Sequence, residues 1–162
     1  MKQCTLCFLF DDANSRMLMG LKIKGFGAGK INAFWGKQDP GETIEHAACR
    51  EVLEESGMIV DQAALEKVAE IAFYFPNPPA GKTWDHYVHV YIARKFSGTP
   101  TETDEMRPAW FALDKIPYEK MWKADATFLP LLLEGKKFRA VYTFPDDCEE
   151  IAKHEITHVD GL

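Results

Sequence analysis

Residues 36–58 read GKQDPGETIEHAACREVLEESGM, and this stretch is the most informative in the chain. After the turn QDPGE, the segment 43–56 contains neither proline nor glycine, which favours a helix. Thr43 is placed to cap the first turn, because a threonine hydroxyl can accept a hydrogen bond from a free backbone N–H group. Gly57 is placed to end the helix, because glycine readily adopts the left-handed conformation of many helix C-termini. The stretch therefore predicts one helix with defined ends.

Three glutamates, Glu51, Glu54 and Glu55, lie within five positions of this helix. At about 100° per residue they fall within an arc of about 100°. Exposed like charges three or four residues apart destabilise a helix by roughly 0.2–0.5 kcal/mol per pair. Two adjacent glutamates on a helix usually indicate an acidic face that is exposed to solvent. Here the small residues Ala47 and Ala48 share the arc and leave room for another group to approach the helix.

The acidic arc also overlaps the side of the helix that its aliphatic residues should bury. Two carboxylates about 4 Å apart repel by about 4 kcal/mol at an effective dielectric constant of about 20, so a partly buried cluster needs cations. Oxygen ligands suit Mg²⁺ or Mn²⁺ rather than zinc. Protein-bound Mg²⁺ is usually held by a few carboxylates together with substrate phosphates. The helix therefore indicates a divalent-metal site for a phosphorylated substrate.

The composition is that of a globular protein: 46% of the 162 residues are hydrophobic, 27% are charged, and the net charge is −6. The length suits a single domain spanning 1–162. The negative charge argues against nucleic acid or a membrane surface as a partner, because both require a basic face. The N-terminus lacks the long apolar segment of a signal peptide, so we expect a cytoplasmic location. We expect buried, reduced thiols at Cys4, Cys7, Cys49 and Cys148.

The rest of the chain is predicted to consist mainly of strands. A second helix is expected at 125–134, interrupted by Pro130. The segment after residue 144 is expected either to pair at a sheet edge or to stay mobile. Strands with two helices spaced among them favour an α/β fold, with a sheet covered by helices on its faces. The expected strands span residues 3–10, 16–23, 31–37, 68–75, 84–96, 109–116 and 136–144.

Two further patterns resemble sites without meeting their requirements. GFGAGK at 25–30 is one residue too short for a P-loop, and Ile31 stands where serine or threonine is needed. We expect a flexible loop that can border a pocket. His86 and His89 are three positions apart on an expected strand, so their side chains point to opposite faces and do not suit one metal ion. We expect two ordinary strand histidines.

The wider spacing around the helix resembles a known signature. From Gly36 the chain has a glycine, five residues, a glutamate, seven residues, Arg-Glu, two residues, Glu-Glu, one residue and a glycine. This matches the complete Nudix box, which would arise by chance in about one chain per million of this length. The pattern GTP-x-E-x-DEMRP-x-WF at 98–111 and the segment FLPLLLEGKKF at 128–138 extend the likeness. They resemble the MutT-homologue purine nucleoside triphosphatases.

This resemblance implies an α/β/α sandwich with a central mixed β-sheet. It implies an enzyme in which water attacks a nucleoside triphosphate and releases the monophosphate and pyrophosphate. The family removes oxidised purine nucleotides such as 8-oxo-dGTP and 2-oxo-dATP. The resemblance further implies Mg²⁺ as the cofactor, with Mn²⁺ as a substitute, and a monomer whose partner is a small-molecule nucleotide.

The resemblance also assigns roles to individual residues. Arg50 would orient the glutamates, and Gly36 and Glu42 would support the loop before the helix. The spacing leaves open which glutamate removes a proton from the attacking water. The metal ligands would be the backbone carbonyl of Trp35 and the carboxylates of Glu51, Glu54, Glu55 and Glu105, and these four glutamates would also be the catalytic residues.

A base pocket is implied as well. Asn32 would offer a hydrogen-bonding amide, and Phe73 and Trp122 would be the stacking walls. The remaining substrate-binding residues would be Thr5 and Lys22 at the rim and Asp125 beside the tryptophan.

Two positions depart from the family pattern. Trp35 occupies the place of a glycine, so its backbone must adopt angles that a residue with a side chain allows. Its bulky ring is also expected to border the pocket. Ala124 replaces the first of two adjacent aspartates and leaves Asp125 alone. In the family, a proton shared by this pair helps to read different oxidised purines. Because a pocket with one acceptor fewer discriminates differently between bases, we expect a narrower or shifted base preference.

Two alternative functions remain open at this point. The same chemistry could act on an unmodified or methylated purine triphosphate, or on a nucleotide sugar. A nucleotide-binding module without turnover is disfavoured, because binding alone has no need of a catalytic base.

Overall fold

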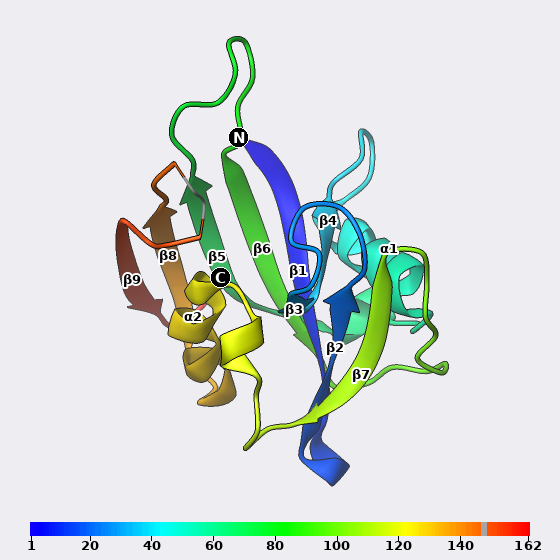
Figure 1. Cartoon of the computed structure of the whole chain (residues 1–162). Helices are drawn as coiled ribbons and strands as arrows, with labels where there is room; N and C mark the ends of the chain where they lie inside the picture. The colour runs from blue at the N-terminus through cyan, green and yellow to red at the C-terminus, as the bar shows by residue number, and fades with distance from the viewer. Residues whose placement is uncertain (147–148) are drawn as a thin grey trace.

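The computed structural model describes residues 1–146 and 149–162, and a single mixed sheet organises them (Figure 1). The sheet order is β3-β2-β1-β6-β5-β8-β9, with β4 paired to β1 and β7 paired to β2. The β1–β6 and β5–β8 pairs are parallel. The elements are β1 (Lys2–Asp11), β2 (Arg16–Lys22), β3 (Ile31–Asn32), β4 (Phe34–Lys37), α1 (Ile44–Ser56), β5 (Leu65–Tyr74), β6 (His86–Ala93), β7 (Met106–Ala112), α2 (Lys123–Leu133), β8 (Lys137–Thr143) and β9 (Lys153–Val159).

The two helices cover opposite faces of the sheet. Val52 of α1 packs in one buried cluster with Cys7 of β1. Phe128 of α2 packs in another buried cluster with Cys4 of the same strand. Residues three positions apart on a strand point to opposite faces, so α1 and α2 lie on different sides. The expected α/β/α sandwich with a mixed sheet is confirmed, and Figure 1 shows the two helices against the sheet.

The cysteines follow the expectation in part. Cys4 and Cys7 are buried and free, as predicted, whereas Cys49 is free but only half-buried. Cys148 lies outside the described residues. None of the described helices is long and apolar enough to cross a membrane.

Strand β1 fixes the position of the loop before α1. One edge of β1 pairs with β6, and the other edge pairs first with β4 and then with β2. In the β1–β4 pair, Gly36 stands opposite Thr5. Because α1 packs against β4, the helix with its glutamates lies directly beside this backbone.

The structure corrects several element boundaries. The expected strand 31–37 is divided, because β3 pairs with β2 whereas β4 pairs with β1, and Ala33 lies at the change of partner. β7 begins at Met106 rather than at 109 and includes Pro108. A proline is tolerated there because β7 pairs only with β2 and is an edge strand. The C-terminal segment pairs as an edge strand, β9, against β8.

Candidate active site

Helix α1 has the ends that its sequence predicts. The Thr43 hydroxyl accepts a hydrogen bond from the His46 backbone N–H at 3.1 Å. At the other end, Gly57 has a φ of 76°, and its N–H donates to the Leu53 carbonyl. These two caps set the limits of the helix. Glu51, Glu54 and Glu55 all lie within these limits, so the helical period decides which of them face the sheet and which face solvent.

Glu55 is the most deeply buried of the helix glutamates, with 2% of its surface exposed. Its Oε1 accepts a hydrogen bond from the Trp35 backbone N–H at 2.8 Å. Burial raises the pKa of Glu55 to about 8, and the charges of Glu51 and Glu105 act in the same direction. Without a cation, this carboxyl therefore keeps its proton at neutral pH.

Glu51 is pressed against the backbone of β4. A Cβ atom built on Gly36 would stand 2.0 Å from the carboxyl carbon of Glu51, so any larger residue there would have to displace the Glu51 carboxylate. Arg50 Nη1 donates to Glu51 Oε1 at 2.8 Å. Burial raises the pKa of Glu51, and the hydrogen bond from Arg50 opposes that rise. The side chain is thus held between a glycine backbone and a guanidinium.

Arg50 also joins the helix to the preceding loop. Its Nη2 and Nε donate to the two carboxylate oxygens of Glu42 at 2.6 and 3.1 Å, and Nη2 donates to the Lys37 carbonyl at 2.9 Å. The hydrogen bond from Arg50 lowers the pKa of Glu42 to about 2. Glu42 also accepts from the Asp39 backbone N–H at 2.7 Å. This arrangement fits the supporting roles expected for Gly36, Glu42 and Arg50.

The other two expected glutamates lie at the margin of the cluster. The Glu54 side chain is 57% exposed, and its Oε2 lies 3.3 Å from Arg50 Nη1. Glu105 is exposed immediately before β7, where its backbone carbonyl accepts from the Ile23 N–H. The charge of Glu105 contributes to the raised pKa values of Glu51 and Glu55, so it lies within electrostatic reach of both. The charge of Glu54 also raises the pKa of Glu51, so the exposed Glu54 and Glu105 both flank the more buried Glu51 and Glu55.

The chemistry of this cluster fits a divalent cation. Burial and the charges of neighbouring glutamates raise the pKa values of Glu51 and Glu55, so a positive ion would stabilise both carboxyls in their charged form. Among the residues that the structure describes, no three acidic, histidine or cysteine side chains form a ready-made metal site. Small rotations of exposed side chains and oxygens from a phosphorylated ligand are therefore needed to complete the coordination.

The backbone at Trp35 accommodates its side chain. Ser15 and Asn77 are the non-glycine residues with positive φ in the described part of the chain, and Trp35 is not among them. The glycine of the family pattern can thus be replaced by tryptophan here without backbone strain.

An aromatic cavity of about 150 Å³ lies beside β4. Four of the expected substrate-binding residues, Asn32, Phe73, Trp122 and Asp125, line it. Aromatic and aliphatic side chains make up most of the remaining wall, as in many sites for flat organic ligands. The other lining residues are Leu6, Phe26, Trp35, Phe75, His86, Val88, Ala124 and Phe144.

The GFGAGK loop covers one wall of this cavity. The Phe26 ring stacks on Trp122 with the ring centres 5.1 Å apart. Lys30 Nζ lies 4.7 Å from the centre of the Trp122 ring. A Cβ atom on Gly27 would come within 3.0 Å of that ring, so glycine permits the close approach. The expectation that this loop borders a pocket is confirmed.

Asp125 is a buried polar group in the cavity wall. It is 7% exposed, and its Oδ2 is buried with no hydrogen-bond partner. Burial raises the pKa of Asp125 to about 7, and the charge of Lys30 opposes the rise. Its neighbour Ala124 adds only a methyl group to the same wall. A buried polar atom without a partner is costly, which fits an atom reserved for a ligand.

Thr5 and Lys22 are not among the lining residues of the cavity. Thr5 is fully buried, and its hydroxyl has no hydrogen-bond partner. The next residue, Leu6, lines the cavity, because successive side chains of a strand point to opposite faces. Lys22 Nζ lies 5.7 Å from the centre of the Trp35 ring, and its charge lowers the pKa of Glu55. Lys22 therefore lies on the side of the acidic cluster.

The ring of Trp35, which was expected to border the pocket, lines the cavity wall. His86 is a polar residue of this wall that the sequence did not predict. His86 was expected to be an ordinary strand residue, yet it lines the wall beside Val88 of the same face. Because side chains alternate along a strand, His86 and Val88 could be assigned to the same face of β6 from the sequence. Only the assembled sheet shows that this face lines the cavity.

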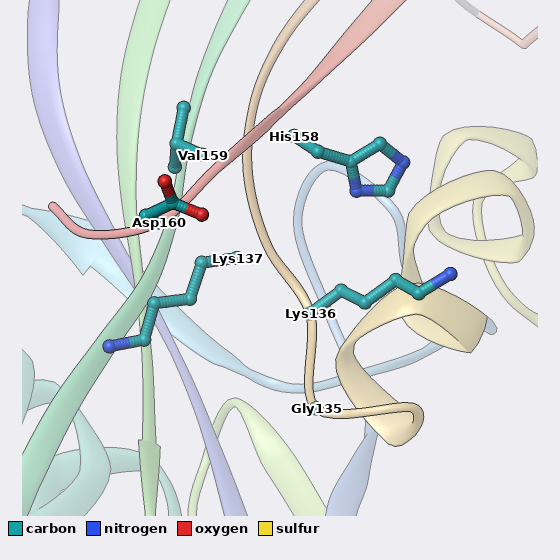
Figure 2. Close-up of a pocket in the computed structure, with 6 residues that line it drawn as sticks. All are labelled: Gly135, Lys136, Lys137, His158, Val159 and Asp160. Carbon is teal, nitrogen blue, oxygen red and sulfur yellow. The ribbon is translucent and has the colours of Figure 1, made fainter.

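A larger hollow, of about 450 Å³, lies where the turn after α2 meets the end of β9 (Figure 2). It shares no residue with the aromatic cavity or the acidic cluster. Lys136 pairs with Glu134 at 3.0 Å, and Lys137 lies 3.8 Å from Glu66, so the charges of both lysines are partly compensated. Its described residues offer no comparable set of catalytic groups. The lining residues are Gly135, Lys136, Lys137, His158, Val159 and Asp160.

Comparisons with known proteins agree with this geometry. The NUDIX domain family model matches residues 2–132. The chain is 46% identical over 147 residues to the oxidized purine nucleoside triphosphate hydrolase of Danio rerio, covering 91% of this chain and 90% of the relative. It is 47% identical to the Mus musculus protein of the same name, with the same coverage. The structure also resembles a MutT protein from Bacillus halodurans, with a TM-score of 0.82, 19% identity, and coverage of 96% of this chain and 97% of the other.

Proposed function

The chain belongs to the NUDIX family, and on this basis we propose that it hydrolyses purine nucleoside triphosphates to nucleoside monophosphates and pyrophosphate, with oxidised purines preferred. The observation that carries the proposal is that Trp35 belongs to both sites. Its backbone N–H donates to Glu55 in the acidic cluster, and its side chain lines the aromatic cavity. A substrate with a flat base at one end and phosphates at the other matches these adjoining sites. The names of the zebrafish and mouse relatives support the choice of oxidised purines.

In the acidic cluster, the proposed ligands of Mg²⁺, or of Mn²⁺ in its place, are the four glutamates and the Trp35 carbonyl. When bound, the ion would neutralise phosphate oxygens and lower the pKa of a bound water. Arg50 would hold Glu51 in position through its 2.8 Å hydrogen bond. One glutamate would accept the proton of the attacking water, as a general base. The glutamates Glu51, Glu54, Glu55 and Glu105 are the candidates for these roles.

In the cavity, the purine would lie against the aromatic walls of Phe73 and Trp122. Asn32 would offer both a donor and an acceptor to the base edge. Asp125 would supply its unpartnered Oδ2. Because Asp125 has a pKa of about 7, it can present either a carboxylate or a carboxylic acid near neutral pH. Its protonation state would therefore contribute to the choice of base.

A substrate panel tests the proposed function. Purified protein is incubated with Mg²⁺ and each of 8-oxo-dGTP, 2-oxo-dATP, dGTP, dATP, a methylated purine triphosphate and a nucleotide sugar. Monophosphate and pyrophosphate are both quantified. We expect at least about tenfold higher kcat/KM for an oxidised purine than for its unmodified counterpart, a difference of about 1.4 kcal/mol in transition-state binding. Equal rates on oxidised and unmodified purines would refute the proposed preference.

Two controls accompany the panel. Glu55→Gln should lose turnover while keeping the fold, as judged by circular dichroism. Release of orthophosphate in place of pyrophosphate would place the attack at another phosphorus and refute the proposed reaction. Faster hydrolysis of the methylated purine or the nucleotide sugar would reassign the substrate within the same chemistry.

A further inference from the structure

His86, the first residue of β6, lines the aromatic cavity but has no place in the roles described so far. Its ring meets the Trp35 ring edge-on, with the centres 6.0 Å apart and the planes at 67°. It meets the Phe75 ring in the same way, at 5.7 Å and 76°. Aromatic contacts from Trp35 in β4 and from Phe75, just after β5, therefore hold the imidazole in the wall.

The imidazole carries an unused hydrogen-bonding atom. Nδ1 of His86 is buried and has no partner. In a neutral imidazole one ring nitrogen donates and the other accepts, so an unpartnered Nδ1 can serve as an acceptor. A buried polar atom of this kind normally has a partner.

The same wall holds a second unused atom. Oδ2 of Asp125 is also buried without a partner. Apart from the two tryptophan rings, the polar side chains of the described lining are Asn32, His86 and Asp125. A flat ligand enclosed by aromatic walls excludes water, so the ligand itself has to supply the missing partners.

We propose that His86 is a specificity-determining residue, whose Nδ1 accepts a hydrogen bond from an N–H group at the edge of an oxidised purine. Oxidation at C8 of guanine or C2 of adenine replaces a C–H group with a carbonyl and converts the adjacent ring nitrogen to N–H. In an unmodified purine that ring nitrogen is itself an acceptor, so the edge has no N–H group to donate to Nδ1. The site then rejects the unmodified purine, because the buried Nδ1 of His86 stays unpaired. The inference rests on the proposed function for the identity of the ligand.

The role of His86 is tested by measuring nucleotide binding in the absence of metal. The monophosphates of 8-oxoguanosine and guanosine are titrated into the protein in the presence of a chelator, and heat release gives each Kd. The wild-type protein should prefer the oxidised base. His86→Leu and His86→Phe both remove the nitrogens, and the second keeps an aromatic ring against Trp35 and Phe75. Each should reduce the oxidised-to-unmodified preference about tenfold, mainly by weakening the oxidised complex.

His86→Asn is the matched variant, because its amide can place a hydrogen-bonding atom near the position of Nδ1. It should keep the preference within about threefold of the wild type. The ratio of kcat/KM for the two triphosphates should follow the same order, with KM changing more than kcat, because the contact is present in both ground and transition states. An unchanged ratio in His86→Leu and His86→Phe overturns the inference. Loss of preference in His86→Asn as large as in His86→Leu overturns it as well, because ring shape would then be responsible.

This design separates the inference from the proposed function. Absence of monophosphate and pyrophosphate from every triphosphate refutes the function, whatever the titrations show. Equal affinity of the wild-type protein for both monophosphates refutes the role of His86, even when hydrolysis is efficient. Thermal unfolding of each variant confirms that the compared proteins are folded.

Discussion

Replacing Glu55 by glutamine should inactivate the protein and stabilise its metal-free form. Glu55 is buried, and burial raises its pKa from 4.5 to about 8. The folded protein therefore binds this proton more tightly than the unfolded chain does. Between these two pKa values the folded state holds more protons, so its stability falls as the pH rises through that window. Glutamine keeps the oxygen that accepts from Trp35 N–H but never becomes charged.

The size of the effect follows from the pKa difference. One pKa unit corresponds to about 1.4 kcal/mol. From about pH 5 to about pH 8 the unfolded chain releases this proton whereas the folded protein retains it, so the free energy of unfolding of the metal-free protein should fall by about 3 kcal/mol. For a chain of this size, 1 kcal/mol shifts Tm by about 2–4 °C, so the variant should gain roughly 10 °C over the wild type at the higher pH. At about pH 5 most of this gain should disappear.

Thermal unfolding in the presence of a chelator, repeated across this pH range, measures the gain. Glu54→Gln is the matched control, because the Glu54 side chain lies on the same helix but is 57% exposed. It should stay within about 0.5 kcal/mol of the wild type at every pH. Mg²⁺ should raise the Tm of the wild type and have less effect on Glu55→Gln, because the ion binds the folded state through the carboxylate. In the same preparation, Glu55→Gln should lose at least about a hundredfold in kcat.

Two results would refute this reasoning. A metal-free Glu55→Gln protein no more stable than the wild type at about pH 8 would show that Glu55 ionises there without cost. Turnover close to the wild-type rate would show that the carboxylate has no part in the reaction. Stabilisation together with inactivation is the expected combination, because the carboxylate is costly without its cation.

Three further substitutions test other parts of the site. Gly36→Ala places a methyl carbon 2.0 Å from the Glu51 carboxyl carbon and must displace it by about 1 Å, so kcat should fall about a hundredfold; unchanged kinetics would contradict the close packing. Arg50→Lys loses the two-pronged contact with Glu42, so kcat/KM should fall about tenfold, and a smaller loss would show that a single charge suffices. Ala124→Asp restores a second carboxyl to the cavity wall and should broaden the range of bases hydrolysed in the substrate panel, whereas an unchanged range would show that this position does not read the base.

The helix and the face that carries its glutamates were predictable because both are local. The cap residue, the terminal glycine and the spacing of the glutamates lie within one continuous segment, and helical geometry converts that spacing directly into a face. The layer arrangement also followed from the pattern of strands and helices. The strand boundaries were less accurate. The change of partner at Ala33 and the proline within β7 depend on which strand lies alongside, and no single segment contains that information.

The local pattern of residues predicts an acidic helix, its two ends and the face on which its glutamates lie. How deeply each glutamate is buried, and which side chains line the cavity, depends on the packing of the whole chain. Burial depends on neighbours: Glu55 has a raised pKa because β4 and the sheet cover it. The cavity joins residues distant in the chain, with Trp35, His86 and Asp125 coming from β4, β6 and α2. Pairing of β1 with both β4 and β6 brings two of these strands together, and that pairing is a property of the whole sheet.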